Sequence, residues 1–249
     1  MNKKLILAIL VILIGGEIDA QIITDRPDQT ESSSTITKGS LQIESGVFMS
    51  NEGNESSSTR QTFLPTNLFR YGLTNGIELR ILNQFEGREI ENDNFQGVSD
   101  LEVGAKIQLL KKESVNTEIV LLTHLIIPSG TNELTGGKYG SINKLCISHE
   151  LNENTEIGYN LGYNYFGEGD GDLTYSLAIG IGVNDKVGVY IEPYGEVTNL
   201  EEFILNFDAG FTYLVNQNLQ LDFSFGTGVN QRMNYISAGC SWLIVKENG

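Results

Sequence analysis

A repeated alternation of apolar and polar residues, beginning at Leu41, constrains this sequence more than any other feature. Over residues 100–109 the apolar set is Leu101, Val103, Ala105, Ile107 and Leu109, and the polar set is Asp100, Glu102, Gly104, Lys106 and Gln108. Successive side chains of a β-strand point to opposite faces, so a period of two predicts strands. The alternation recurs over 76–85, 156–165, 173–183, 203–213 and 219–226. The sequence therefore predicts an all-β protein.

The connections between these stretches alternate between tight turns and longer polar loops. Short turns fall at 74–76, 111–116, 152–154, 184–186 and 216–218. Longer segments rich in Gly, Asn, Asp, Glu or Ser fall at 50–60, 86–96, 129–138, 167–172 and 199–202. Transmembrane barrels have this layout, with short periplasmic turns and longer outer loops. We predict a single antiparallel transmembrane β-barrel of about 12 strands.

The residues on the two faces of the predicted strands indicate whether the outer surface of the protein contacts membrane or water. One face carries large aliphatic and aromatic side chains, as in Phe203, Leu205, Phe207, Phe211 and Tyr213. The other face combines charged residues with many glycines and other small residues, which suits a crowded barrel interior better than a solvated surface. A soluble β-sandwich or a lipocalin-like barrel is the alternative.

The N-terminus has the order of a secretory signal peptide. Lys3 and Lys4 precede an apolar run from Leu5 to Ile14, and a short polar stretch follows, ending at Ala20. We expect a signal peptide over 1–20, an N-terminal periplasmic segment over 21–39 and the barrel over 40–249. Since no later stretch has eighteen consecutive apolar residues, the mature chain cannot cross a membrane as helices. The predicted location is the cell outer membrane.

Charge and reactive residues exclude several classes of protein. The net charge is −16, which argues against nucleic acid as a partner. Cys146 and Cys240 are too few for a disulfide-built scaffold. His124 and His149 do not have the spacing of metal ligands, so we expect no cofactor and no metal site.

The residues before the first strand carry a resemblance to a known family. The segment 24–32, Thr-Asp-Arg-Pro-Asp-Gln-Thr-Glu-Ser, resembles the opening signature of the phenol-degradation meta-pathway (MetA-pathway) family of transporter-like outer-membrane barrel proteins. The resemblance covers nearly the whole mature chain, including the turn at 71–76. It implies a barrel associated with the passage or sensing of small molecules at the outer membrane.

The same segment provides a candidate latch, made of Asp25, Arg26, Asp28 and Glu31. Arg26 is expected to bridge carboxylates such as Asp25, Asp28 or Glu31, and so to close the periplasmic mouth. The alternative is an exposed tail whose ion pairs contribute about 0–1 kcal/mol each.

The polar face of the strands provides the candidate lumen lining: Glu78, Arg80, Asp100, Glu102, Lys106, Glu118, Lys144, Glu156, Glu192, Glu196, Asp208 and Asp222. Rings of charged side chains can select ions in a pore, but mutual pairing in a filled interior accounts for the same residues. If a pore exists, the acidic excess favours cations or neutral solutes over anions.

Three functions follow from this sequence. The first is a transporter or porin-like barrel that passes or binds small molecules, with membrane lipid and a solute as its partners. The second is a structural or surface-interaction barrel with a filled lumen. The third is an outer-membrane acyl hydrolase that uses His124 and a serine of a neighbouring strand. We expect a protein that is not an enzyme; the sequence predicts neither a solute nor an oligomeric state.

Overall fold

The computed structural model describes residues 22–54, 57–91, 93–112, 114 and 116–245. The predicted signal peptide lies outside the described residues. Thirteen β-strands follow the segment 22–40: β1 (Leu41–Asn54), β2 (Ser57–Thr74), β3 (Ile77–Ile90), β4 (Asp93–Val98), β5 (Leu101–Lys112), β6 (Thr117–Ile127), β7 (Gly140–Asn152), β8 (Thr155–Tyr165), β9 (Asp172–Asn184), β10 (Val187–Thr198), β11 (Glu202–Asn216), β12 (Leu219–Gly228) and β13 (Met233–Ile244).

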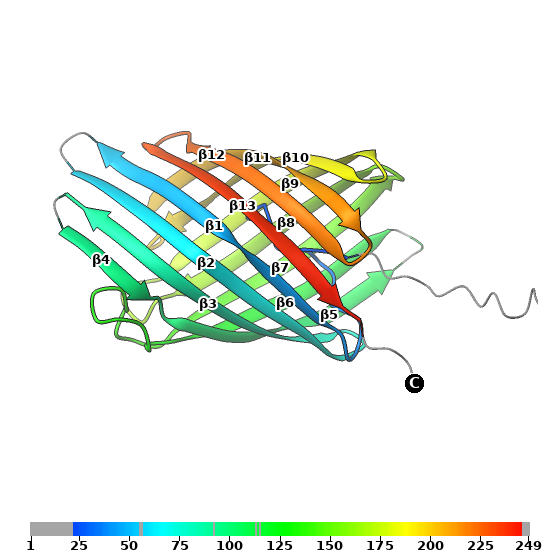
Figure 1. Cartoon of the computed structure of the whole chain (residues 1–249), viewed down its shortest axis with the longest axis horizontal. Helices are drawn as coiled ribbons and strands as arrows, with labels where there is room; N and C mark the ends of the chain where they lie inside the picture. The colour runs from blue at the N-terminus through cyan, green and yellow to red at the C-terminus, as the bar shows by residue number, and fades with distance from the viewer. Residues whose placement is uncertain (1–21, 55–56, 92, 113, 115, 246–249) are drawn as a thin grey trace, which may run out of the picture.

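The strands close into one antiparallel barrel (Figure 1). Each strand pairs with its sequence neighbours, and β1 closes the ring by pairing with β13 from Leu41↔Ile244 to Glu52↔Met233. β4 and β5 both pair with β3, and so they are two parts of one staggered wall strand. The wall therefore has 12 strands, which confirms the predicted architecture and strand number.

The two ends of the barrel differ in their connections. At one end, here called the turn end, lie the short turns after β2, β7, β9 and β11, together with the start of β1 and the end of β13. The opposite end, here called the loop end, has the connections after β1, β3, β6, β8, β10 and β12. The predicted long loops at 50–60 and 86–96 are wrong, because β1 continues to Asn54, β2 begins at Ser57, β3 continues to Ile90 and β4 begins at Asp93. The predicted longer loops at 129–138 and 167–172 do lie at the loop end, opposite the short turns.

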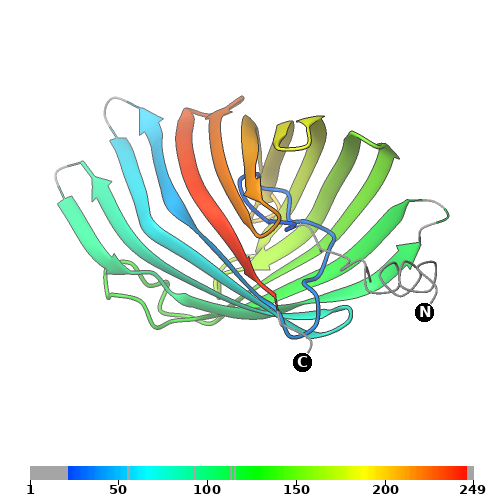
Figure 2. The same ribbon diagram turned by 45° about the vertical axis from the view of Figure 1, so that its right-hand side comes forward.

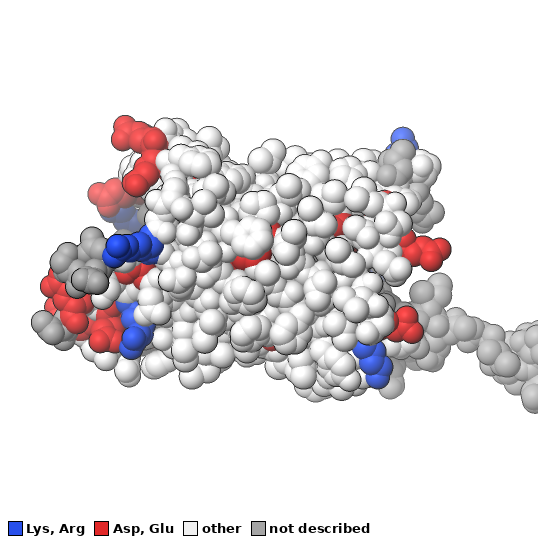
Figure 3. Space-filling view, turned by 90° about the horizontal axis from the view of Figure 1, so that it is seen from above, with Lys and Arg blue, Asp and Glu red and all other residues white. Residues whose placement is uncertain are grey.

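Burial follows the alternation read from the sequence. On β3, Glu78 and Arg80 are buried while Leu79 and Ile81 are exposed, and the other strands repeat this arrangement. The barrel therefore has a polar interior and an apolar outer wall. On the face in Figure 3, the visible Lys and Arg side chains gather near the two ends, and most of the surface between them is uncharged. Among the described residues, no helix is long and apolar enough to span a membrane.

One part of the interior is apolar, which the sequence analysis did not predict. Val120, Leu122 and Cys146 are buried together on β6 and β7, with Ile142 packed against them. The register pairs Val120 with Cys146, which places both side chains on the inner face. Some apolar side chains of β6 and β7 therefore face the interior instead of the outer wall.

Candidate functional site

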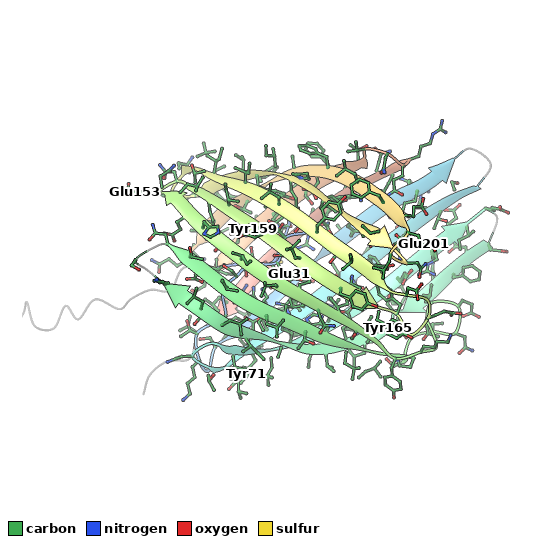
Figure 4. All side chains as sticks on the ribbon, turned by 180° about the vertical axis from the view of Figure 1, so that it is seen from behind. Glu31, Tyr71, Glu153, Tyr159, Tyr165 and Glu201 are labelled. Carbon is green, nitrogen blue, oxygen red and sulfur yellow. The ribbon has the colours of Figure 1, made fainter. Side chains whose placement is uncertain are left out.

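Residues 22–40, here called the lumen segment, enter the barrel at the turn end and return to it before β1 (Figure 2). The backbone N–H of Ile22 donates to the carbonyl of Gln217 at 3.0 Å. Ile22 and Ile36 are buried against Leu243, which fixes both ends of the segment at this mouth. Figure 4 places Glu31 within the barrel, away from Glu153 and Glu201 at the two ends. The segment thus lies inside the barrel.

Asp25 is the centre of an ion-pair cluster between the lumen segment and the wall. Its Oδ1 lies 2.5 Å from Lys106 Nζ on β5, and its Oδ2 lies 2.5 Å from Arg80 Nη1 on β3 and 3.2 Å from Arg70 Nη1 on β2. The remaining carboxylates that pair with these three cations are those of Glu31, Glu44 and Glu78. We call these seven residues the Asp25 network.

Electrostatics keep Asp25 ionised. Burial alone would raise the pKa of Asp25, but Arg70, Lys106 and Arg80 outweigh it and hold that pKa well below its usual value. The cations need the carboxylate equally, since an unpaired buried charge costs several kcal/mol. The lumen segment contributes two of the four carboxylates, Asp25 and Glu31, and without both the three cations would have only Glu44 and Glu78 as partners.

Arg26 occupies a slot in the wall made by two glycines. Gly46 on β1 and Gly239 on β13 face each other in the strand register, and a Cβ built on either would come within 2.6 Å of the Arg26 side chain. In this slot Arg26 donates to Asp222 at 2.9 and 3.2 Å and to the hydroxyl of Ser237 at 2.9 Å. The expectation that Arg26 bridges Asp25, Asp28 or Glu31 is wrong, because the paired glycines open a path to a carboxylate of the wall.

Gly239→Ala is expected to weaken the binding of the lumen segment by about 1–3 kcal/mol, the range for a buried polar group left without its partner. The new Cβ would lie 2.5 Å from Arg26 Nε and would displace the guanidinium from Asp222. Hydrogen exchange of the amides of residues 24–30 measures the effect. Gly180→Ala is the matched control, since the single heavy atom near its Cβ lies at 4.0 Å. Equal exchange rates in the two variants would contradict the claim that Arg26 needs the space at Gly239 to reach Asp222.

The far side of the lumen segment is hydrogen-bonded to the opposite wall. Gln29 N donates to Glu192 Oε2 on β10 at 2.7 Å, and the hydroxyls of Thr30 and Ser176 on β9 lie 2.6 Å apart. Further along, the hydroxyls of Ser33 and Ser148 lie 2.6 Å apart, and Ser34 donates to Glu118 at 3.0 Å. Since Asp25 binds β2, β3 and β5, the lumen segment spans the interior from one wall to the other.

Cavities lie on both sides of this bridge. A cavity of about 240 Å³ toward the loop end has Gln29 and Asn160 at its floor, with walls that include Tyr194, Glu196 and Asn206. Two cavities of about 450 and 510 Å³ open toward the turn end, and Asp28, Glu150, Glu156 and Tyr190 line both. Residues 29–31 therefore stand between a space that opens to one end and spaces that open to the other.

The residues predicted to line the lumen fall into different environments. Glu78, Arg80 and Lys106 belong to the Asp25 network; Asp222 binds Arg26; and Glu118 binds Ser34 and Lys111. Lys144 and Glu196 line the loop-end cavity, and Glu156 lines the turn-end cavities. Glu192 and Asp208 face each other across β10 and β11. Asp100 lies in the gap between β4 and β5, where it accepts the N–H groups of Gly130 and Gly136, and so it holds a loop at the loop end.

Sequence reasoning missed Arg70 and Glu44, which are among the most deeply buried residues of the site. Both were visible in the alternation: Glu44 lies on the polar face of β1, and Arg70 interrupts the apolar pattern of β2. Neither residue lies in one of the long regular alternations from which the lumen lining was predicted.

His124 is bound in a way that does not serve a hydrolase. Its Nε2 accepts a hydrogen bond from Arg80 Nε at 2.9 Å, and its Nδ1 lies 2.8 Å from Glu102 Oε2. Both ring nitrogens are thus used by residues other than serine. In the part of the chain that the structure describes, no group of three or more His, Cys, Asp or Glu side chains has an arrangement that could hold a metal ion.

Solved structures similar to this chain are outer-membrane channels and porins. An outer membrane channel from Pseudomonas putida F1 matches with a TM-score of 0.69 and 14% identity, covering 88% of this chain and 100% of the other. The KdgM porin in complex with disordered oligogalacturonate has a TM-score of 0.56 and 10% identity, over 81% and 98% of the two chains. The NanC porin has a TM-score of 0.52 and 10% identity, over 80% and 98%. These matches show the fold.

The search of curated proteins found no match to this chain. A family model does match, over residues 24–242, which includes the lumen segment from Thr24 onward and nearly the whole barrel. This result agrees with the resemblance carried by the segment 24–32. The chain belongs to the family described as "Putative MetA-pathway of phenol degradation".

Proposed function

We propose that this protein is an outer-membrane channel for small molecules, with its turn end in the periplasm and its lumen closed by the lumen segment. The observation that carries the proposal is the position of residues 29–31 between cavities that open to opposite ends of one barrel. The barrier is a single extended segment held by side-chain contacts, and so a modest movement of it would join the two spaces. An apolar outer wall supports the placement in a membrane.

A filled structural barrel is the second candidate, and one observation favours it. An open water path along Glu78, Arg80, Glu102 and Lys106 would favour transport, whereas complete pairing of these residues favours a structural interior. Glu78, Arg80 and Lys106 are engaged in ion pairs and fully buried, and Glu102 lies 2.8 Å from His124 Nδ1 in a hydrogen bond. Along this wall the interior is therefore closed, and the space for a solute lies on the opposite side, next to β8, β9 and β10.

Insertion into the membrane is the first requirement of the proposal. The full-length chain should be recovered in the outer-membrane fraction, and its gel mobility in detergent should change on boiling, because a closed barrel resists unfolding until heated. Soluble recovery from the periplasm without a mobility change would contradict both candidates. Planar-bilayer conductance of the same preparation then distinguishes them, since a filled structural barrel carries no current.

Alkaline pH is expected to loosen the barrier through Asp28. Burial, and next the charge of Glu192, raise the pKa of Asp28 well above its usual value when the lumen segment is in place. A carboxyl with a raised pKa in the bound state stabilises binding below its unbound pKa of about 3.9, and this contribution is lost as pH rises through the raised value. Channel conductance should therefore rise with pH.

Asp28→Asn removes this titrating group and should flatten the rise of conductance with pH. Glu192 and Asp208 also face Asp28, so the variant should retain a smaller slope. Asp185→Asn, in an exposed turn, is the matched control and should keep the wild-type profile. A profile for Asp28→Asn that equals that of the wild type would show that Asp28 does not hold the barrier.

A further inference from the structure

Three carboxylates meet where the lumen segment contacts β10 and β11: two are fully buried, and that of Asp28 is half-buried. Glu192 and Asp208 are opposite each other in the strand register, and both are fully buried. Asp28, on the lumen segment, lies close enough for its charge to interact with both. Among the ion pairs of the described residues, none includes any of these three, which we call the carboxylate cluster.

Two oxygen atoms beside the carboxylate cluster have no hydrogen-bond partner. One is Oδ1 of Asp208, whose Oδ2 accepts from Tyr235 at 2.6 Å. The other is the hydroxyl of Tyr190, whose side chain is only 8% exposed and lies over Gly210, the residue two along β11 from Asp208. Buried polar atoms are nearly always hydrogen-bonded, so two oxygens without a partner at one place indicate a missing hydrogen-bonding group.

The carboxylate cluster is next to open space. Asp28 and Tyr190 line both turn-end cavities, while Tyr194, two residues beyond Glu192 on β10, lines the loop-end cavity. Glu192 uses both of its carboxylate oxygens on the lumen segment, accepting from Gln29 N and Thr30 Oγ1. A ligand in a turn-end cavity therefore meets Asp28 and the side chain of Tyr190, and the buried hydroxyl of Tyr190 and Asp208 lie behind this lining.

The other side of the lumen segment shows what satisfies such a group of oxygens. The ammonium of Lys106 lies 2.5 Å from Asp25 Oδ1, 2.9 Å from the carbonyl of Ser32 and 3.1 Å from its hydroxyl. An ammonium has three donors and a full positive charge, and so it compensates carboxylates that burial would otherwise destabilise. Asp25 has three cations around it, whereas the carboxylate cluster has none among the described residues.

We propose that the carboxylate cluster binds the protonated amino group of a small organic amine, which enters from the turn-end cavities. The ammonium donates to Asp208 Oδ1, to the hydroxyl of Tyr190 and to the carboxylate of Asp28, and its charge replaces the protons that otherwise neutralise the cluster. This site does not depend on passage of a solute through the barrel.

Calorimetric titration of the folded full-length protein in detergent with methylammonium tests the site. Wild-type protein should bind, and Asp208→Asn should weaken binding at least about tenfold, in line with the loss of a charge-assisted hydrogen bond. Tyr190→Phe removes only a hydroxyl and should weaken binding less. Glu150→Gln is the matched control, because Glu150 lines the same cavities outside the carboxylate cluster. Each variant must keep the heat-dependent gel mobility of the folded barrel.

Two comparison ligands separate an amino group from other cations. Tetramethylammonium carries the same charge without an N–H donor, and potassium is a simple ion; both should bind more weakly than methylammonium. Equal binding of either one, or unchanged binding by Asp208→Asn, would overturn the proposal. The affinity for methylammonium should also rise as pH rises above the usual carboxyl pKa of about 3.9, because the bound ammonium displaces the proton that the raised pKa of Asp28 retains. A pH-independent affinity would contradict this exchange.

Discussion

Deletion of residues 24–34 is expected to give a barrel that conducts continuously, with a conductance on the order of tenfold above that of the full chain. This deletion removes the bridge at residues 29–31 and joins the loop-end cavity to the turn-end cavities. It leaves every wall strand intact, since β1 begins at Leu41. Planar-bilayer recordings of both proteins, at equal amounts of inserted barrel, measure the change.

The deletion also separates the two candidate functions. If the barrel inserts, shows the heat-dependent mobility of a closed barrel and still carries no current, the interior is filled by the wall side chains themselves. The proposal of a channel would then be wrong. If it conducts, the lumen segment is the barrier.

Asp25→Ala is expected to weaken the binding of the lumen segment by about 3–5 kcal/mol, the cost of removing one partner from a buried ion-pair group. Arg70, Arg80 and Lys106 would keep only the other carboxylates of the Asp25 network. Hydrogen exchange of the amides of residues 24–34 should accelerate by roughly two to four orders of magnitude. Asp185→Ala, in an exposed turn, provides the control and should exchange as the wild type does.

The pKa of Asp25 predicts where this contribution holds. A depressed pKa in the bound state means that the stabilisation is present above the unbound value of about 3.9 and is lost as pH falls through the bound value. The Asp25 side of the barrier is therefore stable at neutral pH, whereas the Asp28 side weakens as pH rises. Exchange in Asp25→Ala that matches the wild type would show that the segment is held without this network.

Much of the fold could be predicted because residues on the two faces of a strand alternate along the sequence. On β12, Leu221 and Phe225 point outward and Asp222 and Ser224 point inward, as the alternation predicts. The short and long connections then gave the layout of the ends and the number of strands. These features are local, since each depends on residues adjacent in the sequence.

The partners across the interior could not be predicted in the same way. Arg26 and Asp222 are 196 residues apart, and they meet only because closure of the barrel places Gly46 beside Gly239. The stagger of the strands sets such pairs, and no local pattern encodes it. The apolar patch of Val120, Leu122 and Cys146 on the inner face could not be predicted. In a membrane barrel the alternation assigns apolar residues to the outer face, and nothing in the local sequence marks those that face inward.

A reversible disulfide between the lumen segment and the wall tests the central claim most directly. The hydroxyls of Ser33 and Ser148 lie 2.6 Å apart, so Ser33→Cys with Ser148→Cys places two thiols within bonding reach. Cys146→Ala and Cys240→Ala remove the native thiols, and each single cysteine variant is a control. Conductance is then recorded from one preparation, first oxidised and then reduced. We predict that the channel stays closed when the disulfide is formed and that channel openings return after reduction. Equal conductance before and after reduction, in a preparation shown to form the disulfide when oxidised, would contradict a barrier made by the lumen segment.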